Sequence, residues 1–146
     1  MKRLIYIIPI LVLVAVYIAA RTPEAPAKEA VNFFEGSWKD ALAKAKAEKK
    51  LIFLDIYATW CGPCKQLKKY TFANQQVGDY MNANFINVSL DGEQGDGAML
   101  ANEYKIQAYP TLLLVDSTGN LVMNEVGFYN STQFLELIKN NMKNRK

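Results

Sequence analysis

Apolar and polar positions alternate in blocks along this chain of 146 residues, and the blocks predict its strands and helices. The most uniform block is Leu51–Tyr57, a run of Ile, Leu and aromatic residues that is interrupted only by Asp55. A run of this length is typical of a strand that is buried on both faces. We therefore expect strands at 51–57, 85–90, 111–115 and 121–126, and a short first strand at 31–34. The strand at 121–126 is expected because a turn-forming stretch before it predicts a hairpin with 111–115.

Helical patterns fill the intervals between these strands. Ser37 followed by Asp40 has the form of a helix N-cap with its capping-box acid, so a helix is predicted from there to about residue 48. Further helices are predicted after the two cysteines with a break or restart near Asn74, at 98–104, and from Ser131 as the capping residue to about residue 143. Helices that alternate with buried strands and end in a hairpin plus helix indicate an α/β fold, with a central mixed sheet flanked by helices.

Residues 1–20 are a candidate targeting segment. Two basic residues precede an apolar stretch from Leu4 to Ala20, which exceeds the apolar region of a typical signal peptide and just reaches the lower limit for a membrane span. We therefore expect either a signal peptide or an uncleaved N-terminal membrane anchor helix, with the rest of the chain exported. Residues 21–30 are rich in Pro, Ala and charge and are predicted to be a linker, which leaves 31–146 as one folded domain.

The only two cysteines, Cys61 and Cys64, fall where a predicted strand passes into a predicted helix. A thiolate at Cys61 would gain from the unpaired backbone N–H groups and the dipole of the first helical turn, an environment that lowers thiol pKa values from about 8.5 to between about 3.5 and 7.5. Pro63 suits that turn because its missing N–H has no partner there. Cys64 lies on the same helix face, so a disulfide can close with a small adjustment and open again. The pattern predicts a redox-active dithiol.

Two other interpretations of the cysteine pair are open. A structural disulfide would close so short a loop that it would remove little entropy from the unfolded chain. A zinc site needs four ligands, and the chain has no His and no other Cys, so only a dimeric or carboxylate-completed site would remain. We expect neither a metal nor a cofactor.

Composition and charge exclude several classes of function. Without residues 1–20, the formal net charge of +3 falls to +1, which gives no indication of nucleic-acid binding. The absence of His excludes His-based acid–base catalysis and most transition-metal sites. The Gly-rich acidic loop 91–97 lacks the spacing of a calcium loop and is interpreted as a solvated turn, and Lys65, Lys68 and Lys69 as a solvated helix face.

Residues 31–146 resemble the thioredoxin superfamily in several motifs. These are Asp55 six residues before Cys61, the Trp-Cys-Gly-Pro-Cys-Lys core, Tyr109-Pro110-Thr111 before a Leu-rich strand, and Gly127 before the last helix. The stretch from Asp55 to Cys61, followed by Lys69-Tyr70-Thr71-Phe72 and Val77, is most similar to the periplasmic C-terminal domain of the bacterial transmembrane disulfide reductase DsbD and its free-standing relatives. The resemblance implies a thioredoxin fold for the domain.

The resemblance also implies roles for individual residues around the dithiol. Cys61 would be the attacking thiolate and Cys64 the resolving thiol, with a Cys61–Cys64 redox disulfide forming and opening in each cycle. Trp60, Gly62 and Pro63 would shape the surface on which substrates dock. Cys64 is expected to be the more buried of the two cysteines.

Three residues further from the dithiol in sequence complete the implied site. Pro110 would be in cis and face the dithiol, where it holds the Tyr109 backbone so that an extended substrate can pair with it. Tyr109 stands where many thioredoxins carry Ile, which should alter the choice of partner more than the chemistry. Desolvation should raise the pKa of Asp55 and make it a candidate proton acceptor for Cys64, the alternative being an ion-paired or strand-end carboxylate. Many thioredoxins place a Lys beside this Asp, at the position that we align with Asn87.

Motif and resemblance together predict a thiol:disulfide oxidoreductase. We expect a protein-disulfide reductase that acts outside the cytoplasm, in a bacterial periplasm, secreted or anchored by its N-terminal segment. Its expected partners are disulfide-bearing or thiol-bearing exported proteins and a membrane-borne electron donor, and the protein itself is expected to be a monomer. The alternatives are a thiol oxidase or isomerase, and a thioredoxin-fold binding module without catalysis.

Overall fold

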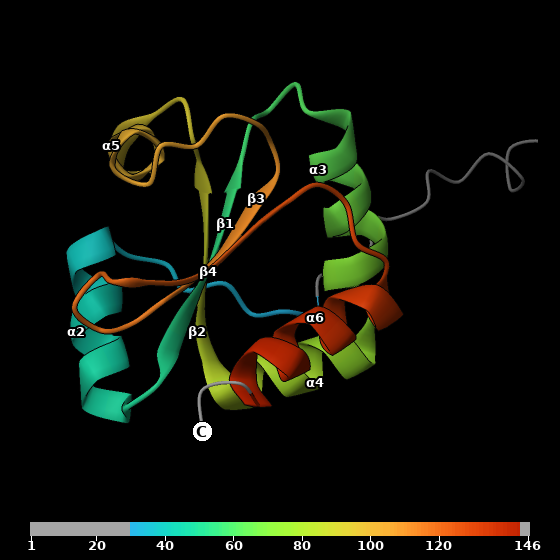
Figure 1. The fold of residues 1–146 in the computed structure, drawn as a ribbon, viewed down its shortest axis with the longest axis horizontal. Helices are drawn as coiled ribbons and strands as arrows, with labels where there is room; N and C mark the ends of the chain where they lie inside the picture. Colours follow the sequence, from blue (N-terminus) through green and yellow to red (C-terminus); the bar gives the residue numbers. More distant parts are fainter. Residues whose placement is uncertain (1–29, 144–146) are drawn as a thin grey trace, which may run out of the picture.

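The structure is a computed structural model that describes residues 30–143 (Figure 1). The predicted signal or anchor segment at 1–20 lies outside the described residues, as does nearly all of the predicted linker. Within residues 30–143, no helix combines the length and the hydropathy that crossing a membrane requires.

A mixed sheet of four strands, in the order β2–β1–β3–β4, forms the centre of the described part. β1 (Leu51–Tyr57) and β2 (Phe85–Asp91) are parallel, whereas β3 (Thr111–Val115) runs antiparallel to both β1 and β4 (Leu121–Val126). All four strands begin where the apolar runs predict, and only β2 extends one residue further than expected. β3 and the five central residues of β1 are buried because helices cover both faces of these inner strands.

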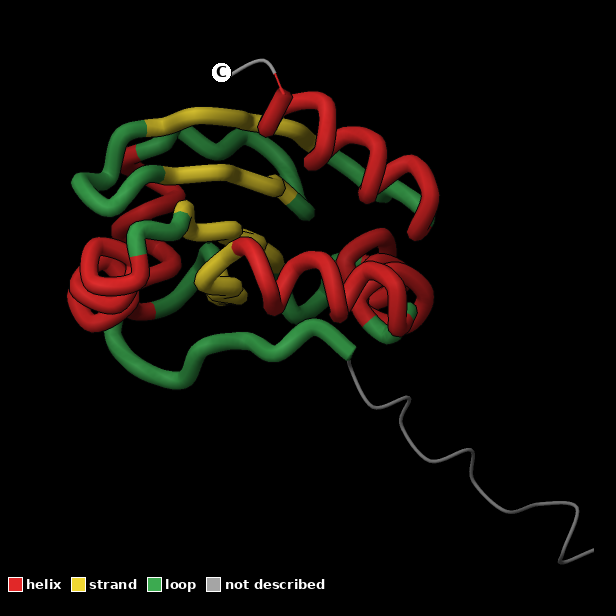
Figure 2. The backbone as a smooth tube through the Cα atoms, turned by 90° about the horizontal axis from the view of Figure 1, so that it is seen from below, coloured by secondary structure: helices red, strands yellow, loops and turns green. Residues whose placement is uncertain are grey.

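Helices lie on both faces of the sheet, in two groups that Figures 1 and 2 show on opposite sides of the strands. One face is covered by α2 (Trp38–Glu48) and α5 (Gly95–Glu103). The other is covered by a run that follows β1 and by the last helix: α3 (Gly62–Gln66), the π-helix η1 (Leu67–Phe72), α4 (Gln75–Asn84) and α6 (Ser131–Lys143). The α/β architecture predicted from the sequence, with a mixed sheet flanked by helices, is confirmed for the described residues.

Four phenylalanine rings fix η1, and with it the dithiol helix, to the sheet. Phe72 of η1 packs edge to face against Phe33, Phe53 and Phe134, with ring centroids 5.3, 5.9 and 5.8 Å away. Phe53 and Phe134 form a further edge-to-face pair at 5.4 Å. Each such pair contributes about 0.5–1.5 kcal/mol beyond the burial of its apolar area. The helix that carries the cysteines therefore continues into a segment held firmly in the core.

The short first strand predicted at 31–34 is reduced to one bridge. Phe33 pairs with Asn87 of β2 in parallel, and no ladder continues from it. The reason is that the chain just before it is bonded elsewhere, because the Val31 N–H donates to the carbonyl of Phe72 at 3.0 Å. This bond directs the segment toward η1 instead of along the edge of β2.

α2 begins at a side-chain cap, and α5 begins in a glycine-rich segment. α2 has the predicted capping box, in which the Asp40 N–H donates to Ser37 Oγ at 3.2 Å. α5 begins at Gly95, three residues before the predicted start. Gly97 in its first turn lies directly against the backbone carbonyl of Asp91, a contact that leaves no room for a side chain. The early start thus depends on a tertiary contact that only glycine allows.

The capping of α4 and α6 is partly as predicted. Asn74 caps α4 through its Oδ1, at the predicted break. For α6, the prediction of Ser131 as the N-cap is wrong, because Asn130 holds that position. Asn130 Oδ1 accepts the Gln133 N–H at 3.0 Å, and Gln133 Oε1 accepts the Asn130 N–H at 3.1 Å. Ser131 is the first helical residue and donates instead to the carbonyl of Tyr70 at 3.0 Å.

Candidate active site

Cys61 and Cys64 form a disulfide in the first turn of α3, at the end of the sheet where β1 stops (Figure 1). Their Cα atoms are 5.3 Å apart. Cys61 is the N-cap of α3, and its sulfur accepts the backbone N–H of Cys64 at 3.1 Å. Pro63 occupies the first turn, as predicted. The helix N-terminus therefore presents a donor to the Cys61 sulfur, which is the contact that stabilises a thiolate at this position.

The two cysteines differ in burial in the opposite sense to the prediction. Cys61 is 3% exposed and Cys64 is 8% exposed, so the expectation that Cys64 is the more buried is wrong for the disulfide form. Both sulfurs lie in a small cluster with Ala58, against which Tyr57 and Tyr109 pack. The chain turns back at this point, with the Cys61 N–H donating to the carbonyl of Ala58 at 3.1 Å. A preference for Cys61 as nucleophile must therefore come from the helix N-terminus and not from exposure.

The Tyr109–Pro110 peptide bond is cis, as the resemblance implies. Pro110 is buried, and its carbonyl accepts the N–H of Gly127 at 2.9 Å. The next residue, Thr111, begins β3 directly opposite Ile56 of β1. Since Ile56 is one residue from the end of β1, the cis-proline segment lies at the same edge of the sheet as the dithiol.

Trp60 is a surface residue that borders the disulfide and is not part of the core. Its side chain is 67% exposed, and its ring lies edge to face with that of Tyr109, with the centroids 6.0 Å apart. Its indole Nε1–H donates to Oε1 of Glu93 at 3.0 Å. The docking role implied for Trp60 stays a prediction. Glu93, which holds the indole, belongs to the loop that sequence reasoning treated as a solvated turn.

The residues around Glu93 also contact Tyr109. Burial raises the pKa of Tyr109, and the nearby carboxylates of Glu93 and Asp91 raise it further. Gly92 lies between these acids, directly beneath the Tyr109 ring: a Cβ at this residue would be 2.7 Å from the hydroxyl oxygen of Tyr109. The turn Asp91–Glu93 is therefore part of the site's wall. The sequence signal for this placement is that the turn directly follows β2, the strand that runs parallel to β1.

Asp55 of β1 is a buried residue. It is 5% exposed, and its Oδ2 accepts a hydrogen bond from Ser89 Oγ at 2.8 Å. The strand register pairs Asp55 with Ser89, so the alignment that placed Asn87 beside Asp55 is wrong. Asp55 and Cys64 share the wall of a cavity of about 310 Å³, whose polar lining also includes Thr59, Lys65, Lys68 and Ser89. A shared cavity is what a proton transfer through one water molecule requires.

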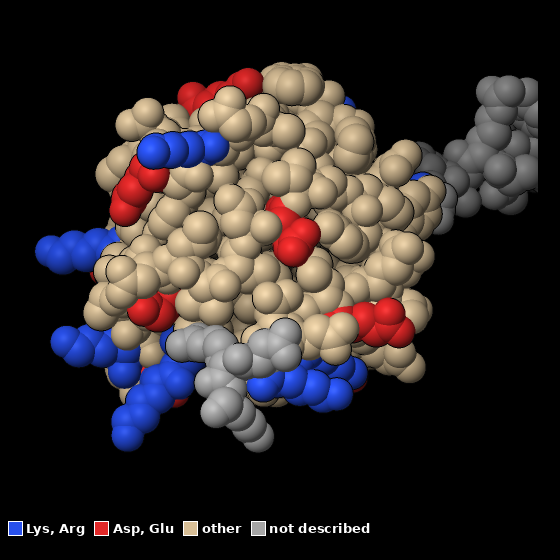
Figure 3. Space-filling model, in the orientation of Figure 1, with Lys and Arg blue, Asp and Glu red and all other residues tan. Residues whose placement is uncertain are grey.

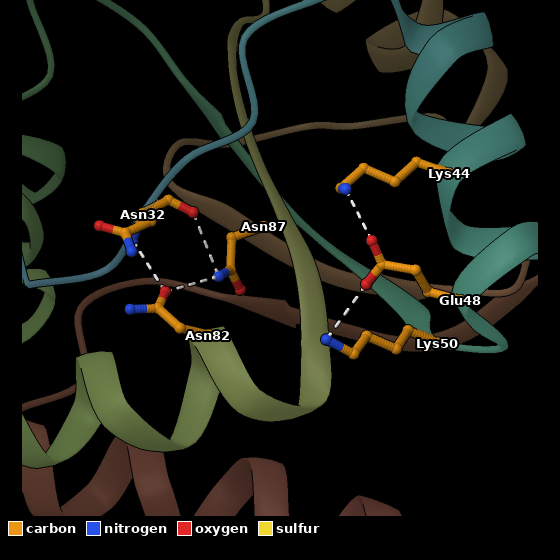
Figure 4. Close-up of polar contacts among 6 residues, drawn as sticks. All are labelled: Asn32, Lys44, Glu48, Lys50, Asn82 and Asn87. Atoms are coloured by element: carbon orange, nitrogen blue, oxygen red, sulfur yellow. Dashed lines mark hydrogen bonds and ion pairs between the residues drawn. The ribbon is translucent and has the colours of Figure 1, made fainter.

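Asn87 belongs to a different polar group, which Figure 4 shows. Its Nδ2 donates to the carbonyl of Asn32 at 3.3 Å and to Oδ1 of Asn82 at 3.2 Å. Asn82 Oδ1 also accepts the backbone N–H of Asn32 at 2.8 Å. Two ion pairs lie beside this group, from Lys44 and Lys50 to Glu48. The asparagine contacts hold the segment before α2 against α4 and β2.

Charged side chains are distributed unevenly over the face drawn in Figure 3. Lysines gather mainly toward the lower end of the molecule, whereas acidic groups are scattered over this face and include some at the upper edge, over the region between the end of β2 and α5. Within residues 30–143, no three His, Cys, Asp or Glu side chains come together as a set of metal ligands. The acidic turn is thus a charged surface feature beside the disulfide.

Known proteins are similar to this chain in sequence. A model of the thioredoxin-like domain family matches residues 38–141. The thiol:disulfide interchange protein DsbD of Yersinia pestis is 32% identical over 99 residues, which are 66% of this chain and 17% of that protein. DsbD of Yersinia enterocolitica is 33% identical over 101 residues, or 67% of this chain and 18% of that protein. The chain therefore spans less than a fifth of the length of these relatives.

Solved structures share the fold. A candidate disulphide-isomerase from Bacteroides thetaiotaomicron is 40% identical, with a TM-score of 0.70 over 78% of this chain and 94% of that chain. The oxidised C-terminal domain of DsbD from Neisseria meningitidis is 25% identical, with a TM-score of 0.61 over 76% of this chain and 98% of that chain. With the family model covering most of the described residues and the sheet and dithiol arranged as above, the chain belongs to the thioredoxin-like domain family and has the thioredoxin fold.

Proposed function

We propose that this protein is a thiol:disulfide oxidoreductase that reduces protein disulfides outside the cytoplasm through a Cys61–Cys64 dithiol–disulfide cycle. The observation that carries the proposal is the position of the Cys61 sulfur, which is the N-cap acceptor of α3 at 3.1 Å from the Cys64 N–H. A sulfur held there is stabilised as a thiolate and is a good leaving group when the disulfide is reduced again. A merely structural disulfide across so short a loop would add little stability.

The reaction moves two electrons in two exchange steps. The Cys61 thiolate attacks one sulfur of the substrate disulfide, a Cys61–substrate bond forms, and the other substrate sulfur leaves as a thiolate that takes up a proton from solvent. Cys64 then loses its proton, with Asp55 as acceptor across the shared cavity, and attacks the Cys61 sulfur. The second substrate thiolate leaves, so the substrate is reduced to a dithiol and Cys61–Cys64 is oxidised to the disulfide.

The other predicted site residues act on binding. Trp60 and Tyr109 offer an aromatic corner beside the disulfide, and the backbone before Pro110 is available to pair with an extended substrate segment. Gly62 has open space around its Cα, so it leaves room for the substrate backbone to approach the sulfur. Pro63 shapes the first turn of α3 and lacks a donor that would otherwise be unpaired.

The direction of electron flow and the location are inferred from the relatives. The matched proteins are named thiol:disulfide interchange protein DsbD. We infer from this likeness that the protein donates electrons to disulfide-bearing exported proteins and receives them from a membrane-borne donor, as a monomer. Residues 1–20 would direct it to the periplasm as a signal peptide or hold it there as an anchor. The alternative function, disulfide isomerisation, is favoured by the name of the Bacteroides relative with 40% identity.

Reduction of insulin disulfides with dithiothreitol as electron source tests the enzyme assignment. Cys61→Ser should abolish the activity. Activity equal to wild type in that variant would mean that the protein is a binding module and not an enzyme. Cys64→Ser should accumulate mixed disulfides through Cys61, and mass spectrometry of these adducts identifies the substrates. Equilibration with a glutathione buffer tests the direction, because a strongly oxidising potential would replace the reductase assignment by the oxidase alternative.

A further inference from the structure

The turn Asp91–Glu93 brings two carboxylates next to the residues that border the disulfide. Glu93 Oε1 accepts the indole N–H of Trp60 at 3.0 Å. Trp60 in turn contacts Tyr109, which packs against the cysteine cluster and precedes the cis-proline. The acidic turn, the exposed indole and the tyrosine thus form one continuous surface, which we name the acidic rim.

The rim is held in a defined conformation. The Gly92 N–H donates to the carbonyl of Tyr57 at 2.8 Å, which joins the turn to the end of β1. Asp91 Oδ1 accepts the Glu93 N–H at 3.0 Å, and its Oδ2 accepts from the Gln94 side chain at 3.2 Å. The two carboxylates are therefore positioned by the fold and do not move freely with a loop.

The charge of the rim is available to a partner. The ion pairs of Glu48 with Lys44 and Lys50 involve neither Asp91 nor Glu93. Glu93 is exposed and Asp91 is half-buried. Their charge reaches the substrate side of the site, since both carboxylates act on Tyr109. Lys65 of the dithiol helix lines the cavity that it shares with Asp55.

We propose that the acidic rim is a specificity-determining surface, which selects protein disulfides flanked by lysine or arginine. The proposal rests on the reductase function proposed above and names its substrate class. A substrate segment that pairs beside Pro110 must pass the Trp60–Tyr109 corner, where a cationic side chain would meet Asp91 and Glu93 and the face of the exposed indole. An acidic side chain at that place would be repelled by both carboxylates.

The experiment uses three peptides that each contain one internal disulfide and differ only in the two residues flanking it, which are Lys, Gln or Glu. The full-length chain reduces each peptide with dithiothreitol as electron source, and kcat/KM is measured at low and high ionic strength. At low ionic strength the Lys peptide should exceed the Glu peptide by about three- to tenfold, because exposed charge pairs are individually weak and two of them act here. High salt should remove most of that ratio.

Two substitutions separate charge from structure. Glu93→Gln keeps an oxygen that can accept from the Trp60 indole but removes the charge, so the Lys/Glu ratio should fall toward one while the Trp60 emission spectrum stays that of wild type. Asp91→Asn should lower the ratio in the same direction. The matched control is Glu136→Gln on α6, an exposed acid of the last helix, which should leave the ratio unchanged.

Two outcomes would overturn the proposal, and they are distinguishable from each other. If wild type reduces all three peptides with equal kcat/KM, or if Glu93→Gln retains the full ratio, the rim does not select charge and the reductase function still stands. If wild type reduces none of the peptides, the reductase function itself fails and the rim proposal with it.

Discussion

Gly92→Ala inserts one methyl group at the place where the acidic turn meets Tyr109. A Cβ at residue 92 would lie 2.7 Å from Cε1 and from the hydroxyl oxygen of Tyr109, and 2.8 Å from Cγ2 of Ile56. Contacts this short are not found in proteins, so one of the neighbours must move. Ile56 is fully buried in β1, between two other strands, and the residue 92 backbone is bonded to Tyr57. The tyrosine ring, which is only half-buried, is therefore the group that moves.

The cost of this overpacking is about 1–3 kcal/mol in the free energy of unfolding. That is a large share of the roughly 5–15 kcal/mol that keeps a domain folded. It should lower the midpoint of thermal unfolding by about 4–8 °C for each kcal/mol. A displaced Tyr109 also loses its contact with Trp60 and disturbs the segment before Pro110, so kcat/KM for disulfide reduction should fall as well.

A double-mutant cycle assigns the effect to Tyr109. Tyr109→Ile removes the ring atoms that the new methyl group would meet, so Gly92→Ala should cost less in that background, with a coupling of about 1 kcal/mol or more measured by urea denaturation of the oxidised protein. Costs that add within about 0.5 kcal/mol would refute the reasoning. They would mean that the methyl group is accommodated by the backbone or by Ile56.

Four other residues yield predictions. Phe72→Ala should lower the free energy of unfolding by about 3–5 kcal/mol in urea denaturation, because it removes a buried ring that contacts three others; a cost below about 1 kcal/mol would contradict this packing. Asp116 accepts four hydrogen bonds in the β3–β4 turn, and these bonds hold its pKa below the usual range. Wild type should therefore be more stable than Asp116→Asn above about pH 4, and this difference should disappear as the pH falls through the lowered pKa. Burial raises the pKa of Tyr104 to about 12, so wild type should lose stability between about pH 10 and 12, and Tyr104→Phe should lose less over the same range, as thermal unfolding measures. Ser89→Ala removes a hydrogen bond to the Asp55 carboxylate and should move the acid limb of the pH–rate profile of disulfide reduction to higher pH; an unmoved limb would contradict a proton-accepting role for Asp55.

The strands were predictable because their signal is local. β1 and β3 are apolar runs bounded by polar or turn-forming residues, and burial between two layers of helices requires such a run. β4, which is mostly exposed, was predicted from the turn that joins it to β3. The cysteine pair was predictable for the same reason, since its placement between strand and helix is readable in a short stretch of sequence. The redox role that follows from it remains a proposal to be tested with Cys61→Ser.

The errors lie where neighbouring residues offer equal local signals. Asn130 and Ser131 are both good N-cap residues, and the choice between them is made by a distant contact, the bond from Ser131 to the Tyr70 carbonyl. Asn87 and Ser89 lie on the same face of β2, so a register error of two residues exchanges them without violating the hydrophobic pattern. Only the pairing of β1 with β2 identifies Ser89 as the neighbour of Asp55.

The contact of the acidic turn with the site was not predicted, because its partner, Trp60, is 33 residues away in sequence. Its position nevertheless follows from the topology. β1 and β2 are parallel, so their C-terminal ends meet at one edge, where Tyr57 is paired with Asp91. β3 is antiparallel to β1, so its start meets the same edge, where Thr111 is paired with Ile56.

This edge therefore collects three loops whatever their sequences are: the loop to the dithiol after β1, the acidic turn after β2, and the cis-proline segment before β3. The sheet order makes them neighbours, and the side chains on them determine what the site does. The first loop carries the two sulfurs that exchange electrons, and the third carries the backbone that can pair with a substrate. The second contributes no group to the chemistry, so its charge can change without altering the exchange reaction. On a surface of that kind, a preference among substrates can change while the exchange reaction stays the same. The property to vary is therefore the charge of Glu93 and not its hydrogen bond to Trp60.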